Sequence, residues 1–143
     1  ETGIVVCGRS GNKYYVLEDK SGKYSPDDWG RIAIRLFYDT NADRIVAEVN
    51  NGGDLVERLI RTIDSKVPYT PVRASRGKMM RAEPVAALYE QERVSHIGVF
   101  SELEEQMCSY TPEARTSPDR LDALVWALTE LSDTRGSAYW RIS

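Results

Sequence analysis

Two aspartates lie three positions apart near the start of an apolar segment, SPDRLDALVWALTEL at 117–131. Asp119 and Asp122 share one face if this segment is helical. Asp122 has apolar neighbours on both sides, and a buried carboxylate is costly unless it is paired or binds a metal ion. Taken alone, the pattern suits a second interpretation equally well. Asp119 would then be a first-turn charge favoured by the helix dipole, and Asp122 would pair with a nearby arginine.

The segment that carries these two acids is predicted to be a well-buried helix. Ser117 can cap it, and Pro118 suits its first position. Apolar residues recur at helical spacing and form a wide stripe. The stripe consists of Leu121, Leu124, Val125, Leu128 and Leu131, extended by Ala123, Trp126 and Ala127. We therefore expect the rest of the domain to pack around 117–131.

A third acid, Glu48, lies near the carboxyl end of a predicted strand, Arg44–Val49. The strand runs into Asn50–Gly53, and a helix is predicted to follow. In open α/β sheets, ligands bind at the carboxyl edge of the strands. A strand acid brought together with acids of a helix forms a site of hard oxygen ligands, which suits Mg²⁺ or Mn²⁺.

Three blocks of the chain carry a family resemblance when they are taken together. They are EVNNGGD at Glu48–Asp54, SRGKMMRAEPVAALYEQ at Ser75–Gln91 and SPDRLDALVWALTEL at 117–131. In this order, across most of Glu1–Leu131, they resemble the C-terminal nuclease domain of terminase large subunits from tailed phages or prophages. The resemblance implies an RNase H-like fold and a two-metal endonuclease, with Mg²⁺ or Mn²⁺, that cuts double-stranded DNA during genome packaging.

The resemblance also implies roles for the acids. Glu48 and Asp122 would bind the metal ions, and Asp119 would either bind them directly or support a ligand. One ion would lower the pKa of the attacking water and the other would stabilise the leaving oxygen. The family has a further metal-binding Asp shortly upstream of a segment like Glu1–Gly8. Glu1 does not match that acid, so we expect one ligand, and the first strand of the fold, upstream of this chain.

A cluster of four cations follows the strand predicted within Val67–Ala74. It consists of Arg73, Arg76, Lys78 and Arg81, and no acid occurs before Glu83. Pro84 suits a first turn, so the helix through Tyr89 is predicted to begin between Gly77 and Glu83. The charges alone fit either a solvated basic loop or contacts with DNA phosphates, which position a duplex without reading its bases. The resemblance favours phosphate contacts.

Composition indicates one soluble domain over 1–143. The chain is 41% hydrophobic and 29% charged, with a net charge of −3, which argues against nonspecific coating of DNA but allows a local basic groove. No apolar run is long enough to span a membrane, and no signal peptide is present. Cys7 and Cys108 lack metal-ligand spacing and suit a reducing compartment, and the resemblance implies the cytoplasm of a bacterial host. His96 is the single histidine and is interpreted as structural.

A Walker A motif is not present in this sequence. Arg76, Gly77 and Lys78 are followed by Met79, and the spaced upstream glycine of the motif is missing. The ATPase motor of the family is therefore expected to lie outside this chain. The resemblance implies that the full-length protein combines this domain with an ATPase domain, and that its partners are a portal, a small terminase subunit and double-stranded DNA.

The remaining periodicity predicts an α/β domain with a mixed sheet flanked by helices. Besides those named above, the predicted strands are Gly3–Gly8, Lys13–Glu18 and Val94–Phe100. Three other helices are predicted. One is capped by Ser25, with an inward stripe of Trp29, Ile32, Ala33, Leu36 and Phe37. The second is Gly53–Asp64, with Leu55, Val56, Leu59, Ile60 and Ile63 inward, and the third is Ser101–Cys108.

Three local features complete these expectations. Ser101 and Glu104 have the spacing of a capping box. Asp19 follows a strand at a position where the family often has an acid, but exposed acids after strands are common and we expect a loop residue. The tail at 132–143 is expected to be loosely ordered.

Two other functions fit the same residues. One is another RNase H-like nuclease, such as a junction resolvase, because both enzymes use clustered acids. Activity on linear duplex compared with branched DNA separates these two. The other is a catalytically silent module that docks on DNA or on a packaging partner. It would bind DNA without cutting it, even with the upstream sequence restored.

The basic cluster leads to the first prediction. Replacing Arg76 and Lys78 with alanine should weaken duplex binding to a similar degree on any DNA, because phosphate contacts are independent of sequence. For every phosphate that the variant no longer binds, the slope of log affinity against log salt should fall by about 0.9. Binding titrations at several salt concentrations measure this slope. An unchanged slope would mean that the cluster is only a solvated loop.

Overall fold

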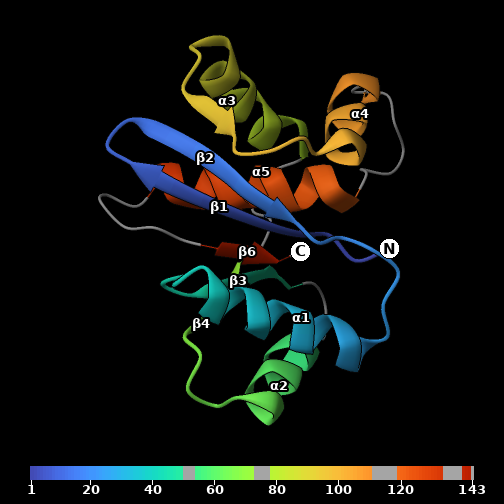
Figure 1. Cartoon of the computed structure of the whole chain (residues 1–143). Helices are drawn as coiled ribbons and strands as arrows, with labels where there is room; N and C mark the ends of the chain where they lie inside the picture. Colours follow the sequence, from blue (N-terminus) through green and yellow to red (C-terminus); the bar gives the residue numbers. More distant parts are fainter. Residues whose placement is uncertain (50–53, 73–77, 111–118, 134–139, 143) are drawn as a thin grey trace.

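The computed structural model describes residues 1–49, 54–72, 78–110, 119–133 and 140–142. Strands and helices mostly alternate along the chain (Figure 1). In chain order they are β1 (Ile4–Ser10), β2 (Lys13–Asp19), α1 (Pro26–Asp39), β3 (Ile45–Glu48), α2 (Asp54–Ile63), β4 (Tyr69–Val72), α3 (Lys78–Glu90), β5 (Val94–His96), α4 (Ser101–Ser109), α5 (Asp119–Asp133) and β6 (Trp140–Ile142).

The described strands form one mixed sheet of six, in the order β4-β3-β6-β1-β2-β5. Antiparallel pairs join β1 to β2 and β1 to β6, while β3 pairs parallel with both β4 and β6. The pair of β2 with β5 is also parallel. The prediction of an α/β domain with a mixed sheet flanked by helices is confirmed.

Helices cover both faces of the sheet, with α3, α4 and α5 on one face and α1 and α2 on the other (Figure 1). Strand β1 shows why. Val5 and Cys7 belong to the core under α5, whereas Ile4 and Val6 belong to the core over α1 and α2. Successive side chains of a strand point to opposite faces, so the apolar run from Ile4 to Cys7 requires a layer on each side.

Helix α5 lies at the centre of the first core. Five of its side chains are fully buried: Ala123, Leu124, Ala127, Leu128 and Leu131. The prediction of a well-buried helix is confirmed, and α5 continues two residues beyond the predicted end, to Asp133. Ser117 and Pro118, the predicted cap and first residue, lie outside the described residues.

The cap of α1 forms as expected, because the Asp28 amide donates to Ser25 Oγ at 3.3 Å. The predicted capping box at the start of α4 is wrong. Phe100 is the N-cap residue, and no side chain caps the helix there. The Glu104 carboxylate instead accepts from the Phe100 amide and lies 2.9 Å from His96 Nδ1. A tertiary partner has therefore replaced the local one.

Other local predictions also fail where tertiary structure overrides them. Pro84 lies inside α3 rather than in its first turn, and packing of the next residue, Val85, against the core holds the helix around it. Strand β5 ends at His96, shortly before Gly98, which has a φ of 156°. Leu55 was expected to point inward but is 70% exposed.

The predicted loose tail is also wrong for part of its length. Trp140–Ile142 forms β6, which lies in the sheet between β1 and β3. Separately, within the described residues, no helix has both the length and the apolar character needed to cross a membrane.

The buried position of α5 leads to a stability prediction. Leu128→Ala should lower the free energy of unfolding by about 2–5 kcal/mol, because it removes a fully buried side chain and leaves a cavity. Leu55→Ala is the matched control, with an expected change of at most about 0.5 kcal/mol because that leucine is exposed. Urea unfolding of both variants measures the difference. Equal losses would contradict the placement of α5 at the core.

Candidate functional site

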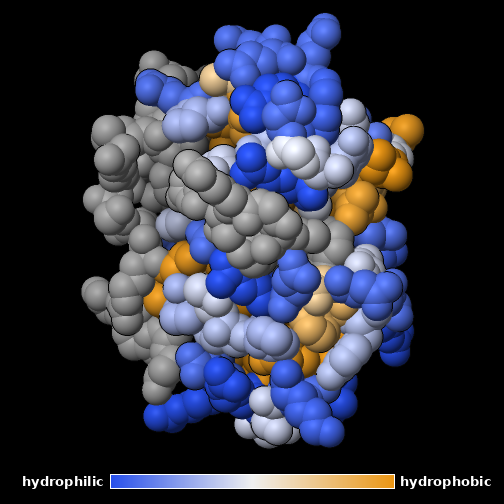
Figure 2. All heavy atoms as spheres, turned by 90° about the vertical axis from the view of Figure 1, so that its left-hand side faces the viewer, coloured by the Kyte–Doolittle hydropathy of each residue, from blue (hydrophilic) through white to orange (hydrophobic). Residues whose placement is uncertain are grey.

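Glu48 lies at an end of the sheet where several strands finish together. It is the register partner of Val72, the last residue of β4. Ala47, one position before it, pairs with Ile142 of β6, and Ile142 pairs in turn with Ile4, the first residue of β1. We call this the carboxyl end of the sheet, since β2, β3, β4 and β6 all finish there. The opposite end, seen in Figure 2, is largely hydrophilic with apolar side chains in separate patches.

The side chain of Glu48 projects from the sheet face that α5 covers. Ile45 belongs to the core over α1 and α2, so residues 44, 46 and 48 project to the other face. An ion pair supports this direction, because Arg44 Nη2 lies 3.5 Å from Glu130 Oε1 of α5.

Helix α5 runs in the opposite direction to β3. Arg44, just before β3, meets Glu130 near the end of α5, whereas the start of α5 lies against Gly3 at the carboxyl end. The four residues from Arg44 to Glu48 span about 13 Å of strand. The eight residues from Glu130 back to Asp122 span about 12 Å of helix. Asp122 and Glu48 are therefore both on the side of the sheet that α5 covers, and both lie toward its carboxyl end.

Asp119 and Asp122 both belong to the first turn of α5, where the helix dipole favours negative charge. Asp122 is half-buried, and the Asp119 side chain is 47% exposed. The position of Asp119 in the first turn fits the second interpretation of the sequence, a charge favoured by the helix dipole, and it leaves a role at a metal site open.

A divalent ion such as Mg²⁺ needs several oxygen ligands. No group of three His, Cys, Asp or Glu side chains that could hold a metal ion occurs in the described ranges. The donor chemistry nevertheless fits, because Mg²⁺ is commonly held by one or two carboxylates together with water and substrate phosphates. Glu48 and Asp122 supply two such carboxylates from a strand end and a helix start.

Strand β4 ends beside Glu48, and two members of the basic cluster belong to α3. The Val49 amide donates to the Val72 carbonyl at 2.9 Å, so β4 ends next to Glu48. Arg73 and Arg76 lie outside the described residues. Lys78 and Arg81 belong to the start of α3, a helix that packs on the same core as α5.

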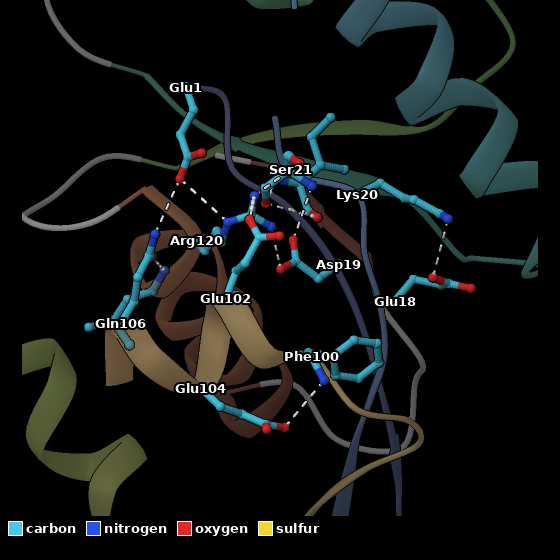
Figure 3. Close-up of polar contacts among 12 residues, drawn as sticks. Glu1, Glu18, Asp19, Lys20, Ser21, Phe100, Glu102, Glu104, Gln106 and Arg120 are labelled. Carbon is cyan, nitrogen blue, oxygen red and sulfur yellow. Dashed lines mark hydrogen bonds and ion pairs between the residues drawn. The ribbon is translucent and has the colours of Figure 1, made fainter. Parts of the chain in front are cut away.

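Sequence reasoning missed a buried ion cluster at the carboxyl end, shown in Figure 3. Asp19 was expected to be a loop residue, but it ends β2 and its side chain is only 4% exposed. Its Oδ2 accepts a 2.8 Å hydrogen bond from Arg120 Nη1, and its Oδ1 accepts from the Ser21 amide. The available signal was an arginine within an apolar helix, since arginine is rarely buried without a partner.

Arg120 has two further carboxylate partners. Its Nη2 lies 2.6 Å from Glu102 Oε2, and its Nε lies 3.5 Å from Glu1 Oε1. Burial alone would lower the pKa of Arg120, but the hydrogen bond with Asp19 and the negative charges of Asp19, Glu1 and Glu102 outweigh burial and raise it. We call Glu1, Asp19, Glu102 and Arg120 the Arg120 cluster.

His96 has a structural setting. Its Nδ1 lies 2.9 Å from Glu104 Oε2 of α4, and its Nε2 lies 2.7 Å from the Tyr89 hydroxyl of α3. The hydrogen bond with His96 lowers the pKa of Glu104, and burial raises the pKa of Tyr89. These contacts tie β5 to the two helices, which agrees with the structural interpretation of this histidine.

Comparison with protein families gives a match over most of the chain. The sequence model of a family described as "Terminase RNaseH-like domain" matches residues 1–131. No curated protein and no solved structure matches the chain. The matched range includes Glu48, the basic cluster, the Arg120 cluster and both aspartates of α5.

The contact of α5 with β1 leads to a prediction at Gly3. A Cβ atom there would overlap the backbone carbonyl of Asp119 and lie 3.2 Å from Ala123 Cβ. Gly3→Ala should therefore lower the free energy of unfolding by about 1–3 kcal/mol, because the start of α5 must shift. Urea unfolding measures the loss.

The control for this variant is Gly11→Asn. Gly11 has a φ of +60° and no atom within 4 Å of an added Cβ, and asparagine tolerates that backbone conformation. Its unfolding midpoint should stay close to that of the parent chain. If Gly3→Ala unfolds at the same midpoint as the control, α5 does not press on β1 at this point.

Proposed function

Because the chain belongs to the family of terminase RNaseH-like domains, we propose that it is a metal-dependent endonuclease that cuts double-stranded DNA during phage genome packaging. Membership in this family supports a nuclease-type role in packaging. One observation supports the assignment of this role to Glu48 and Asp122. Glu48 and Asp122 come from a strand end and a helix start, and they lie on one face at one end of the sheet.

In this proposal Glu48 and Asp122 hold the divalent ions, and Asp119 binds beside them or supports a ligand. Two Mg²⁺ or Mn²⁺ ions, when bound, supply an attacking water of lowered pKa and a positive charge for the leaving oxygen. The protein contributes two carboxylates on rigid elements, since Glu48 ends a paired strand and Asp122 lies on a buried helix. Sites carried by strands and helices hold their geometry better than sites on loops.

We propose that DNA phosphates contact Arg73, Arg76, Lys78 and Arg81. Two observations support this path. The segment that carries them leaves β4 beside Glu48, and it enters a helix that packs on the same core as α5. The chain has a net charge of −3, so a duplex would have to be held by a local group of cations. Such contacts orient the backbone without selecting a base sequence.

The remaining parts of the proposal follow from the family. In the full-length protein, this domain would work with an ATPase domain, a portal and a small terminase subunit. Packaging of a phage genome would take place in the cytoplasm of a bacterial host. The nuclease would then cut the duplex that the motor delivers to it.

The proposal is tested by Glu48→Ala. This variant should lose Mg²⁺- or Mn²⁺-dependent cutting of plasmid DNA, because half of the carboxylate pair is removed. Its thermal unfolding should remain close to that of the parent chain, since the replaced side chain is only half-buried. Agarose-gel assays of supercoiled plasmid measure nicking and linearisation.

Glu105→Ala is the matched control, since it removes an exposed glutamate from α4. The control should cut as the parent chain does. Metal-dependent nicking retained by Glu48→Ala would remove Glu48 from the site.

A further inference from the structure

Arg120 lies between Asp119 and Asp122 in the first turn of α5, and its guanidinium meets Asp19 of β2 and Glu102 of α4. Figure 3 shows it directed toward the end of β2 and the start of α4. Arg120 is only 8% exposed, and the Asp19 side chain that it meets is 4% exposed. A charge that is withdrawn from water at such a place needs a structural reason.

The partners of Arg120 come from elements far apart in the sequence. Asp19 ends β2, and its hydrogen bond to Arg120 spans 101 positions. Glu102 belongs to the first turn of α4, and its contact with Arg120 is the shortest in the cluster, at 2.6 Å. Ser21 adds a carbonyl that accepts from Nη2 at 3.3 Å. The guanidinium therefore joins β2, α4 and α5 at the carboxyl end of the sheet.

Helix α4 also caps α5. Gln106 Oε1 accepts a 3.1 Å hydrogen bond from the Leu121 amide, and Gln106 Nε2 donates to Glu1 Oε1. The first amides of a helix have no partner within the helix and need one from outside. Helix α4 thus supplies a charge partner and a backbone cap to the same turn of α5.

The direction of Arg120 determines the direction of Asp122. Residues two apart on a helix project about 200° apart, which is nearly opposite. In the sheet order, β2 lies on one side of β1, and β6 and β3 lie on the other. When Arg120 is anchored to Asp19 of β2, Asp122 is turned toward β6 and β3, where Glu48 lies.

The far end of α5 gives an independent check of this rotation. Glu130 lies eight positions after Asp122, on the same row of i, i+4 neighbours. It pairs with Arg44, next to β3, at 3.5 Å. Glu130 faces the β3 side, and Asp122, about 80° away around the helix axis, projects from the same half of the helix.

We propose that Arg120 is a positioning residue that sets the rotation of the first turn of α5, so that Asp119 and Asp122 are presented toward Glu48. The inference rests on the proposed nuclease function for its catalytic meaning. The mechanical part, that the Arg120 cluster holds this turn, does not depend on that function.

The test compares Arg120→Lys and Asp19→Asn with the control Arg61→Lys. Lysine keeps the charge but lacks the planar fork that meets several oxygens at once. Arg61 pairs with Glu57 on the exposed surface of α2, so its replacement controls for the loss of an arginine ion pair. Each variant is assayed without metal by hydrogen exchange, and with Mn²⁺ in plasmid cutting.

Without metal, hydrogen exchange at the amides of 121–124 should become faster by about tenfold or more. The amides of 128–131 should keep their protection, because local opening would be confined to the first turn. With metal, the Mn²⁺ concentration for half-maximal cutting should rise by about 10–100-fold, and saturating Mn²⁺ should restore much of the rate. This is the range found when residues that orient metal ligands are replaced. Arg61→Lys should change neither measurement.

Glu102→Gln removes one charge partner of Arg120 and leaves its buried pair with Asp19 in place. The replaced side chain is 74% exposed. This variant should give the same two changes at smaller size. If Arg120→Lys does not fold, hydrogen exchange and the Mn²⁺ dependence of cutting in Glu102→Gln decide the proposal.

The outcomes separate the inference from the function on which it rests. If Glu48→Ala is inactive but both Arg120→Lys and Glu102→Gln keep the parent Mn²⁺ dependence, the positioning role is overturned and the nuclease stands. Uniform loss of protection along α5 would also overturn the positioning role, because Arg120 would then stabilise the whole helix rather than its first turn. If the parent chain with its upstream sequence does not cut, the nuclease proposal fails, and the exchange pattern still decides whether the Arg120 cluster holds the turn.

Discussion

The burial of α5 against β1 is the constraint on which the rest of the structure depends. Its fully buried residues meet both strands of the first hairpin in one core. This contact places the first turn of α5 at the end of the sheet where Glu48 lies. Hydrophobic burial, however, is not directional, so it brings the helix onto the sheet without selecting its exact rotation. Directional polar contacts have to complete the arrangement.

Those contacts lie at both ends of the helix and on opposite sides of it. Near the start, Arg120 reaches β2 through Asp19, and near the end, Glu130 reaches the β3 side through Arg44. Replacing one member of a buried ion pair leaves the other charge uncompensated, so such pairs resist rearrangement. The apolar stripe and the two polar contacts together define where Asp119 and Asp122 point.

The carboxyl end of the sheet is rich in negative charge. Glu1, Asp19, Glu102, Asp119 and Glu48 all occur there, together with the buried guanidinium of Arg120. Like charges in close proximity oppose one another unless cations intervene. This arrangement suits the proposed site, in which divalent ions would offset these charges when a polyanion binds.

Much of this protein could be predicted from sequence, because periodicity reports on burial within a single element. The stripe of α5, the hairpin of β1 and β2, the cap at Ser25 and the strand that ends in Glu48 are all local patterns, and each is confirmed. Where a residue had a distant partner, local reasoning failed. Glu104 accepts from the Phe100 amide and meets His96, so the capping box expected with Ser101 does not form, and Trp140–Ile142 lies in the centre of the sheet rather than in a loose tail. The pairing of Asp19 with Arg120 joins residues 101 positions apart, and only the register of the sheet and the packing of α5 bring them together. The sequence by itself determined which elements form and which acids stand at their ends. Tertiary structure decided which way those acids turn, since that depends on contacts between elements that no local period encodes.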